Sequence, residues 1–176
     1  GVVRLALFQA RRDRVTLPVW ILGITVLGFA TSSAVATQFG DEAAQAAILT
    51  LAASNPAFLA ALMSTFLVVR HTRTDEELGR AELLGSVPLP RAASVAAALL
   101  LGAAANLLLG GFVAAGFVAA GLPVPGAVWA GAAVGAVGVS FVGLAAVVAQ
   151  VLPSGRSANG AAAALVGAAY LIRGIG

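Results

Sequence analysis

The chain has 176 residues, of which 60% are hydrophobic and only 10% are charged. Soluble globular domains carry about 25% charged residues, so this composition excludes an ordinary water-soluble surface and indicates a polytopic, all-α membrane protein. The absence of cysteine excludes disulfides and thiolate metal sites, and the formal charge of +3 is too small to indicate a nucleic-acid partner.

Residues 1–14, GVVRLALFQARRDR, mix apolar side chains with arginines. This pattern favours a short helix that lies in the membrane interface with its apolar side toward the lipid, and the alternative is a frayed start of the first span. The basic residues concerned are Arg4, Arg11, Arg12 and Arg14.

Residues 16–39 form the first expected span, because they contain no charged residue. Pro18 stands near its start, where a missing N–H costs little, and Trp20 falls at headgroup depth. The arginines before this span place the N-terminus in the cytoplasm by the positive-inside rule. Asp41 and Glu42 are then outside.

Residues 57–69 form a second apolar run, which at 1.5 Å per residue reaches only about 20 Å and falls short of the hydrocarbon core. The basic residues that follow from Arg70 require a return to the cytoplasm. One explanation is that residues 43–55 extend the helix outward despite Asn55 and Pro56. The other, which we favour, is that the chain as written lacks residues near positions 59–63.

The segment 70–91 carries four of the ten arginines and four of the seven acids. Thr74, followed three residues later by Glu77, is typical of a capping box, and the intervening acids suit the N-terminal end of a helix. We therefore expect a short amphipathic helix over residues 74–85, ended by Gly85 and the prolines beyond it. Its apolar stripe has two explanations: docking on the membrane surface, which its acids disfavour on an anionic leaflet, and docking on a protein partner.

Three further spans are expected at residues 92–121, 127–152 and 157–172. The first is about 45 Å long as a continuous helix, so it must tilt, break or protrude, and we expect the weak point at Gly110–Gly111. Five spans place nine of the ten arginines inside, and Arg173 alone outside.

The fourth span carries small residues at Gly131, Gly135 and Gly138, a spacing that lets helix backbones approach closely. We interpret it as packing within the bundle, with a dimer seam as the alternative.

The spans hold no catalytic constellation. His71 is interpreted as a solvated side chain at headgroup level, and Asn106 as the donor of an interhelical hydrogen bond rather than part of a substrate path. The absence of lysine excludes a Walker A phosphate loop. The polar residues that could line a substrate path are Thr25, Thr31, Ser64 and Asn106.

The stretch "EELGRAELLGSVPLPR" resembles the cytoplasmic loop of type-2 ABC exporter permeases, with its pattern E-x-x-G-x-x-E-x-L followed by Pro and Arg. "RLAL", "RRDRVTLPVW", "NPAF", "FLVVRHTRTDEELGRAELL" and "ANLLLG" extend the resemblance to the drug- and antibiotic-efflux branch of high-GC, actinobacterial-type bacteria. The positions that match the loop pattern are Glu76, Gly79, Glu82, Leu84, Pro88 and Arg91.

This resemblance implies one six-span half of an exporter, with residues 1–14 as its elbow helix and 74–85 as the coupling helix seated on an ATPase. Its members have more of the second span and a sixth span, so we expect a fragment of a longer chain. The coupling residues implied are Asp75, Glu76, Glu77, Gly79, Arg80, Glu82, Leu83 and Leu84.

The resemblance further implies a multi-pass protein of the plasma membrane with a cytoplasmic N-terminus. Its partners are two ATPase subunits that bind ATP and Mg²⁺, a second copy or half of the membrane domain, and lipids. The chain itself holds no cofactor, metal or catalytic residue, and its substrate is a hydrophobic drug, antibiotic or lipid. The alternatives are an intramembrane enzyme, which the spans do not support, and a non-transporting assembly or signalling protein whose loop binds a regulator.

Overall fold

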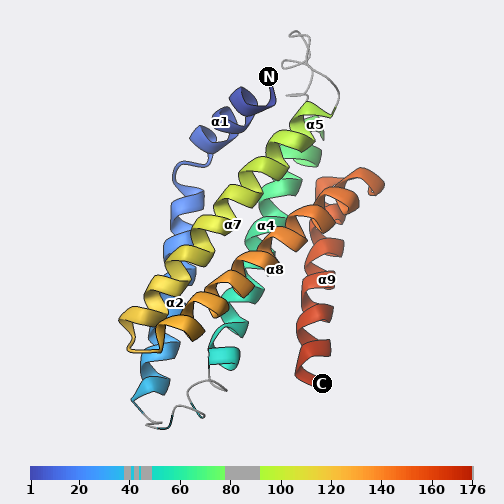
Figure 1. Cartoon of the computed structure of the whole chain (residues 1–176). Helices are drawn as coiled ribbons and strands as arrows, with labels where there is room; N and C mark the ends of the chain where they lie inside the picture. Colours follow the sequence, from blue (N-terminus) through green and yellow to red (C-terminus); the bar gives the residue numbers. More distant parts are fainter. Residues whose placement is uncertain (38–40, 42–43, 45–48, 78–91, 176) are drawn as a thin grey trace.

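The structure, a computed structural model, describes residues 1–37, 41, 44, 49–77 and 92–175. Within these residues the chain is all-α, and five helices are long and apolar enough to cross a membrane. The expected all-α bundle of five spans is thereby confirmed. The crossing helices run alternately up and down, with α1 lying across one end of the bundle (Figure 1).

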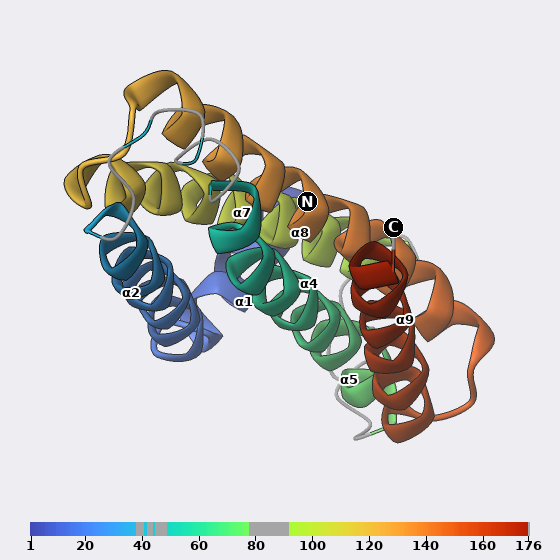
Figure 2. The same cartoon turned by 90° about the horizontal axis from the view of Figure 1, so that it is seen from below.

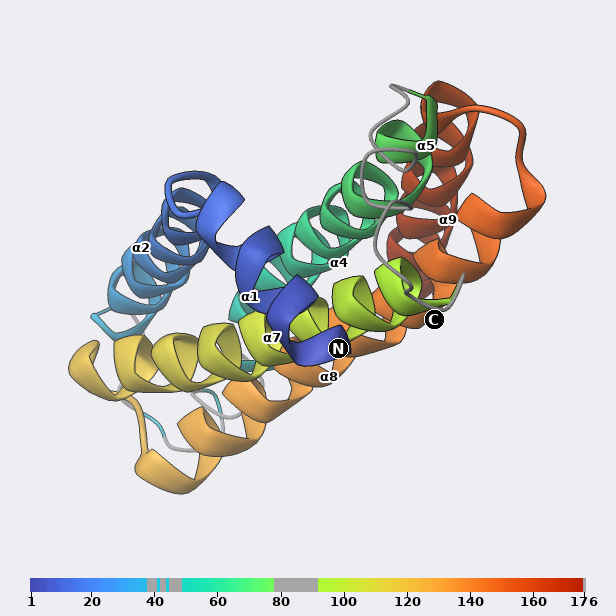
Figure 3. The same cartoon turned by 90° about the horizontal axis from the view of Figure 1, so that it is seen from above.

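The first crossing helix is α2 (Thr16–Ala36), and it follows α1 (Val2–Arg12) after a short turn. Leu5 of α1 packs on Ala93 and Ala97 at the start of α7, and Figure 3 shows α1 crossing over α7. Val3, Leu7 and Phe8 of α1 are exposed, and exposed apolar side chains suit a helix in the membrane interface. The expected helix is present, and its place in the interface stays a prediction.

The second crossing helix is longer than the apolar run of 13 residues. It is made of α4 (Ser54–Val69), η1 (Arg70–Thr74) and α5 (Asp75–Glu77), and helical residues from Leu49, followed by a turn at Ala53, extend the span outward. Pro56 is accommodated because α4 begins after this turn, so Pro56 lies in the first turn of α4, where no helical N–H is needed. The structure thus shows helical residues outward of Pro56, from Leu49. That the chain as written lacks residues near positions 59–63 stays a prediction.

The third and fourth crossing helices are α7 (Ala93–Ala119) and α8 (Val124–Val151). No break occurs at Gly110–Gly111, so that expectation is wrong: Gly110 is a contact point with α8, while the space beside Gly111 is open. The turn between the helices contains Gly121 with φ of +90°, a conformation suited to glycine at a helix C-terminus.

The fifth crossing helix is α9 (Gly155–Ile175). Viewed along the bundle, α2, α4 and α9 form one layer and α7 and α8 the other (Figure 2). The helix running from Leu49 to Glu77 is the central one, because 61% of its most apolar window is buried, against 17% for α2 and α9.

Close packing of α7 on α8 depends on the glycines of α8. A Cβ atom on Gly131 would lie 2.7 Å from that of Ala114, and one on Gly135 would lie 3.0 Å from the carbonyl oxygen of Asn106. Such separations are too short for real side chains, so these positions admit only glycine without movement of the backbone. The interpretation of this face as packing within the bundle is confirmed.

Candidate functional site

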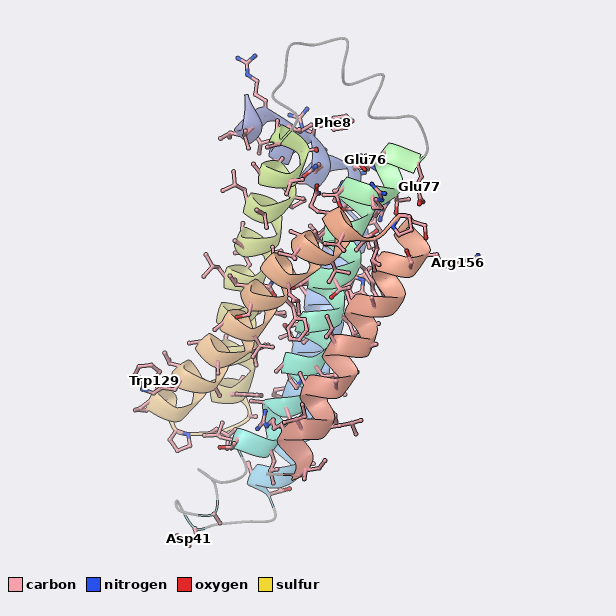
Figure 4. The ribbon with its side chains drawn as sticks, turned by 90° about the vertical axis from the view of Figure 1, so that its right-hand side faces the viewer. Phe8, Asp41, Glu76, Glu77, Trp129 and Arg156 are labelled. Atoms are coloured by element: carbon pink, nitrogen blue, oxygen red, sulfur yellow. The ribbon has the colours of Figure 1, made fainter. Side chains whose placement is uncertain are left out.

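The described arginines are distributed unequally between the two ends of the bundle. Seven of the eight lie on α1, in the turn after it, at the end of the α4–η1 helix or at the start of α9, and only Arg173 lies at the other end. Figure 4 shows Phe8, Glu76, Glu77 and Arg156 at the arginine-rich end and Asp41 and Trp129 at the opposite one. The distribution agrees with the expected alternation of the spans.

Charged side chains from three elements meet at the arginine-rich end. We call Arg12, Asp13, Arg70, His71 and Asp75 the junction cluster. They come from the end of α1, the turn before α2, and the η1–α5 segment. The cluster therefore joins the start of the first span to the end of the second.

Asp13 is the centre of this cluster, and its side chain is fully buried. Its carboxylate accepts a hydrogen bond from Nε2 of His71 and pairs with Nη1 of Arg70 at 2.9 Å. Burial by itself raises the pKa of Asp13, but the hydrogen bond to His71 and the charges of His71, Arg70 and Arg12 outweigh it, and the pKa lies below its usual value. An ionised Asp13 therefore holds the second span against the start of the first.

The prediction of a solvated His71 is wrong. Its side chain is fully buried, because η1 turns it toward Asp13 instead of toward the surface. Its other nitrogen, Nδ1, lies 3.9 Å from Oδ2 of Asp75. His71 is thus placed between two carboxylates of the junction cluster.

The second link in the cluster joins Arg12 and Asp75. Nη1 of Arg12 donates to both carboxylate oxygens of Asp75, at 2.9 and 2.7 Å. The hydrogen bonds that Arg12 donates to Asp75, opposed by burial and reinforced by the charges of Asp75 and Asp13, raise the pKa of Arg12. The carboxylate of Asp75, expected among the partner-facing residues, is directed at α1 instead.

A further set of contacts fastens the same segment to the turn before α9. Nη2 of Arg73 donates to the carbonyl oxygen of Pro153 at 3.0 Å, and the backbone N–H of Gly155 donates to Oε1 of Glu77 at 2.8 Å. A carboxylate at this position also interacts favourably with the positive N-terminal end of the α9 helix dipole. The end of the second span is consequently tied to both α1 and α9.

The capped helix expected over residues 74–85 is only partly within the described residues. Thr74 lies at the end of η1, inside the helical segment, and does not begin a new helix, and the carboxylate of Glu77 accepts a hydrogen bond from Gly155, so the arrangement expected of a capping box is not seen. Asp75, Glu76 and Glu77 continue the second span as helix. The remaining coupling residues, Gly79, Arg80, Glu82, Leu83 and Leu84, lie outside the described residues.

Of the four residues proposed for a substrate path, Ser64 and Asn106 meet, while the side chains of Thr25 and Thr31 form their hydrogen bonds elsewhere. Nδ2 of Asn106 donates to Oγ of Ser64 at 2.8 Å inside the bundle, which confirms the interhelical hydrogen bond. Thr25 and Thr31 donate to carbonyl oxygens of their own helix. None of the four lines the cavity of about 370 Å³ found between α4, α8 and α9.

Sequence reasoning missed the pairing of Asp13 with His71, although a signal was present. Asp13 is an acid inside the basic run RRDR at the entry to the first span, and His71 stands at the exit of the second. Two such groups at the same membrane depth need partners, because an unpaired buried charge is costly. What the sequence could not supply is which partner each one takes.

Comparison with known proteins relates the whole chain to a membrane permease. No family model matches it. All of the chain aligns with a multidrug efflux system permease protein of Mycobacterium tuberculosis, at 36% identity over 202 positions. The chain spans 36% of that protein's length. The alignment has more positions than the chain has residues, so the relative contains segments that this chain lacks. The resemblance to actinobacterial efflux permeases is thereby confirmed.

Proposed function

We propose that this chain is the membrane-spanning part of an ATP-driven efflux permease, the class to which its full-length similarity connects it. The single observation that carries the proposal is this similarity, at 36% identity over all of the chain. Five helices able to cross a membrane and an arginine-rich end support it. The protein exports a hydrophobic drug, antibiotic or lipid-like molecule.

The proposed orientation follows from the arginines. The end that carries α1, η1 and the start of α9 faces the cytoplasm, because basic residues near span ends are retained on that side. The N-terminus is then cytoplasmic, and Glu77 and Ala93, described residues on either side of positions 78–91, lie on the side where ATP is available. Trp129 and Tyr170 then lie toward the outer face.

The proposed partners are two ATPase subunits and a second copy or half of the membrane domain. This chain contains no lysine and therefore no P-loop of the Walker A type. ATP and Mg²⁺ belong to the ATPase subunits, and this chain performs no hydrolysis itself. Its own task is to receive the conformational change of the ATPases and pass it to the spans.

The junction cluster suggests how that transmission works. A force on the segment 78–91 acts first on Asp75–Glu77, to which it is directly joined. The Arg12–Asp75 pair and the contacts of Asp13 pass the displacement to α1 and α2, while the bond from Gly155 to Glu77 passes it to α9. Buried, charge-assisted contacts suit this role because they are lost or re-formed as discrete steps.

The proposal is tested by purifying the whole protein from its own cells and identifying what accompanies it. An ATPase with a P-loop should co-purify, and Glu82→Arg or the pair Leu83→Asp and Leu84→Asp should release it while the membrane fold persists. Arg4→Glu is the matched control, because Arg4 is an exposed charge at the same end. Retention of the ATPase and of transport in both loop variants contradicts the coupling role.

A second readout separates binding from transmission. Asp75→Asn should leave the ATPase bound, because the carboxylate faces Arg12, but it should lower transport per ATP hydrolysed. The purified complex in proteoliposomes measures both quantities. If only a protein without ATPase activity accompanies the chain, the assignment as an ATP-driven permease fails. The result then supports the alternative of a non-transporting protein whose loop binds a regulator.

A further inference from the structure

A cavity lies at the end of the bundle opposite the junction cluster. Its volume is about 370 Å³, within the range of small-molecule sites. Its walls come from the turn before α4 and the start of that helix, the first half of α8, and Arg173 near the end of α9. Apart from Thr50 and Arg173, these walls consist of alanine, glycine, valine, leucine and one tryptophan.

The depth of this cavity corresponds to one leaflet of a bilayer. Along α8 its lining runs from Gly126 to Val137, which is about 16 Å of helix, close to half of the ~30 Å hydrocarbon core. Trp129 at its outer part is 78% exposed, as expected for an aromatic residue at headgroup depth. The cavity therefore runs from the headgroup region toward the bilayer midplane.

The charge at the rim of the cavity is unusual for this chain. Among the eight described arginines, Arg173 alone lies at this end, so the positive-inside distribution does not account for it. Its Nη2 donates to the carbonyl oxygen of Thr50 at 2.9 Å, which holds the guanidinium over the cavity. No acidic side chain of the described residues pairs with it. A guanidinium has five N–H donors, so others remain for an anion.

We propose that this cavity binds an anionic phospholipid of the surrounding leaflet, with one acyl chain in the apolar space and the phosphate against Arg173. An apolar channel of leaflet depth with a single fixed cation at headgroup level matches the shape and charge of that ligand. A neutral hydrophobic molecule would use the apolar walls alone and leave the cation without a partner. The site goes beyond the proposed function, since it needs only the membrane fold.

Trp129 lines the cavity and provides the readout, because bromine atoms on an acyl chain quench a nearby tryptophan. The whole protein is placed in nanodiscs containing phosphatidylglycerol or phosphatidylcholine with the same dibrominated chains. The Trp129 signal is obtained by subtracting the fluorescence of the Trp129→Phe variant. Trp20, obtained in the same way, serves as the control, because it packs near Phe66, away from the cavity.

We expect the phosphatidylglycerol to occupy the site about fivefold more strongly than the phosphatidylcholine, the effect of one basic residue near an anionic lipid. Arg173→Gln should abolish this preference and Arg173→Lys should retain most of it. Ala133→Leu, which fills the cavity, should lower Trp129 quenching by both lipids. Trp20 quenching should stay the same in all variants, which also reports that the fold is intact.

Two results would overturn the proposal. One is equal quenching of Trp129 by the two lipids in the unmodified protein, which would make this a neutral hydrophobic site. The other is a phosphatidylglycerol preference that survives Arg173→Gln. Neither result bears on whether an ATPase accompanies the chain, so the failure of this inference is distinguishable from the failure of the proposed function.

Discussion

Truncating the Arg12–Asp75 pair should reveal a direct energetic coupling between α1 and the end of the second span. The side chains of Arg12 and Asp75 are 25% and 13% exposed, and two charge-assisted hydrogen bonds join them. Exposed pairs contribute about 0.2–1 kcal/mol, whereas breaking a fully buried pair costs about 3–5 kcal/mol. This intermediate burial leads us to expect a coupling energy of about 1–2 kcal/mol.

The assay is a double-mutant cycle of Arg12→Ala and Asp75→Ala, with unfolding followed in mixed micelles as the denaturing detergent is increased. The matched control is the pair Arg73 and Glu76, which is more exposed, at 27% and 45%, and lies within one segment. Its coupling should be about 0.3–0.5 kcal/mol. Additive effects of Arg12→Ala and Asp75→Ala, or a coupling no larger than the control, would refute the assigned link between α1 and α5.

Three further predictions concern other contacts. Gly138→Ala should destabilise the fold by about 1–3 kcal/mol, because the added methyl group meets the side chain of Asn106. The control Gly143→Ala adds a methyl group that meets nothing, and it should change the free energy of unfolding by no more than about 0.5 kcal/mol. Equal effects of the two variants in unfolding curves would contradict the packing of α8 on Asn106. Asp13→Asn should lower the free energy of unfolding at pH 7, and this loss should shrink below about pH 4. The reason is that a carboxyl group whose pKa is lowered by folding stabilises the protein at pH values above its unfolded-state pKa, and this stabilisation disappears on acidification. A loss that stays constant from about pH 7 to about pH 3 is the opposing result. Glu77→Gln should accelerate amide exchange at the start of α9, and unchanged exchange would show that Glu77 does not cap that helix.

Several features of the fold could be predicted because they depend on neighbours in sequence. The apolar runs predict the five spans, and the arginines predict which ends lie together. The interhelical hydrogen bond of Asn106 and the glycine face of α8 were anticipated as packing features, since a buried amide needs a partner and small residues allow close helices. Neither pattern identified the neighbour in advance.

The errors share one physical origin. The second span was expected to be too short because Asn55 and Pro56 were treated as a boundary, yet both lie in the first turn of α4, where the missing N–H of a proline costs little. His71 was expected to be solvated because its neighbours in sequence are charged. In the structure the extended helix turns it inward, where Asp13 provides the partner that makes burial possible.

The sequence by itself determined that this protein is a bundle of membrane-crossing helices with one arginine-rich end, because the cost of placing each residue in lipid is a local property that accumulates along a segment. Only the tertiary structure decided which charges pair, that Asp75 faces α1 while Glu77 caps α9, and that a cavity opens beneath Arg173. Those arrangements join residues far apart in the chain, from 58 positions for Asp13 and His71 to 123 for Thr50 and Arg173. They depend on how the helices pack, since a charged group inside a bundle takes the partner that packing brings within reach.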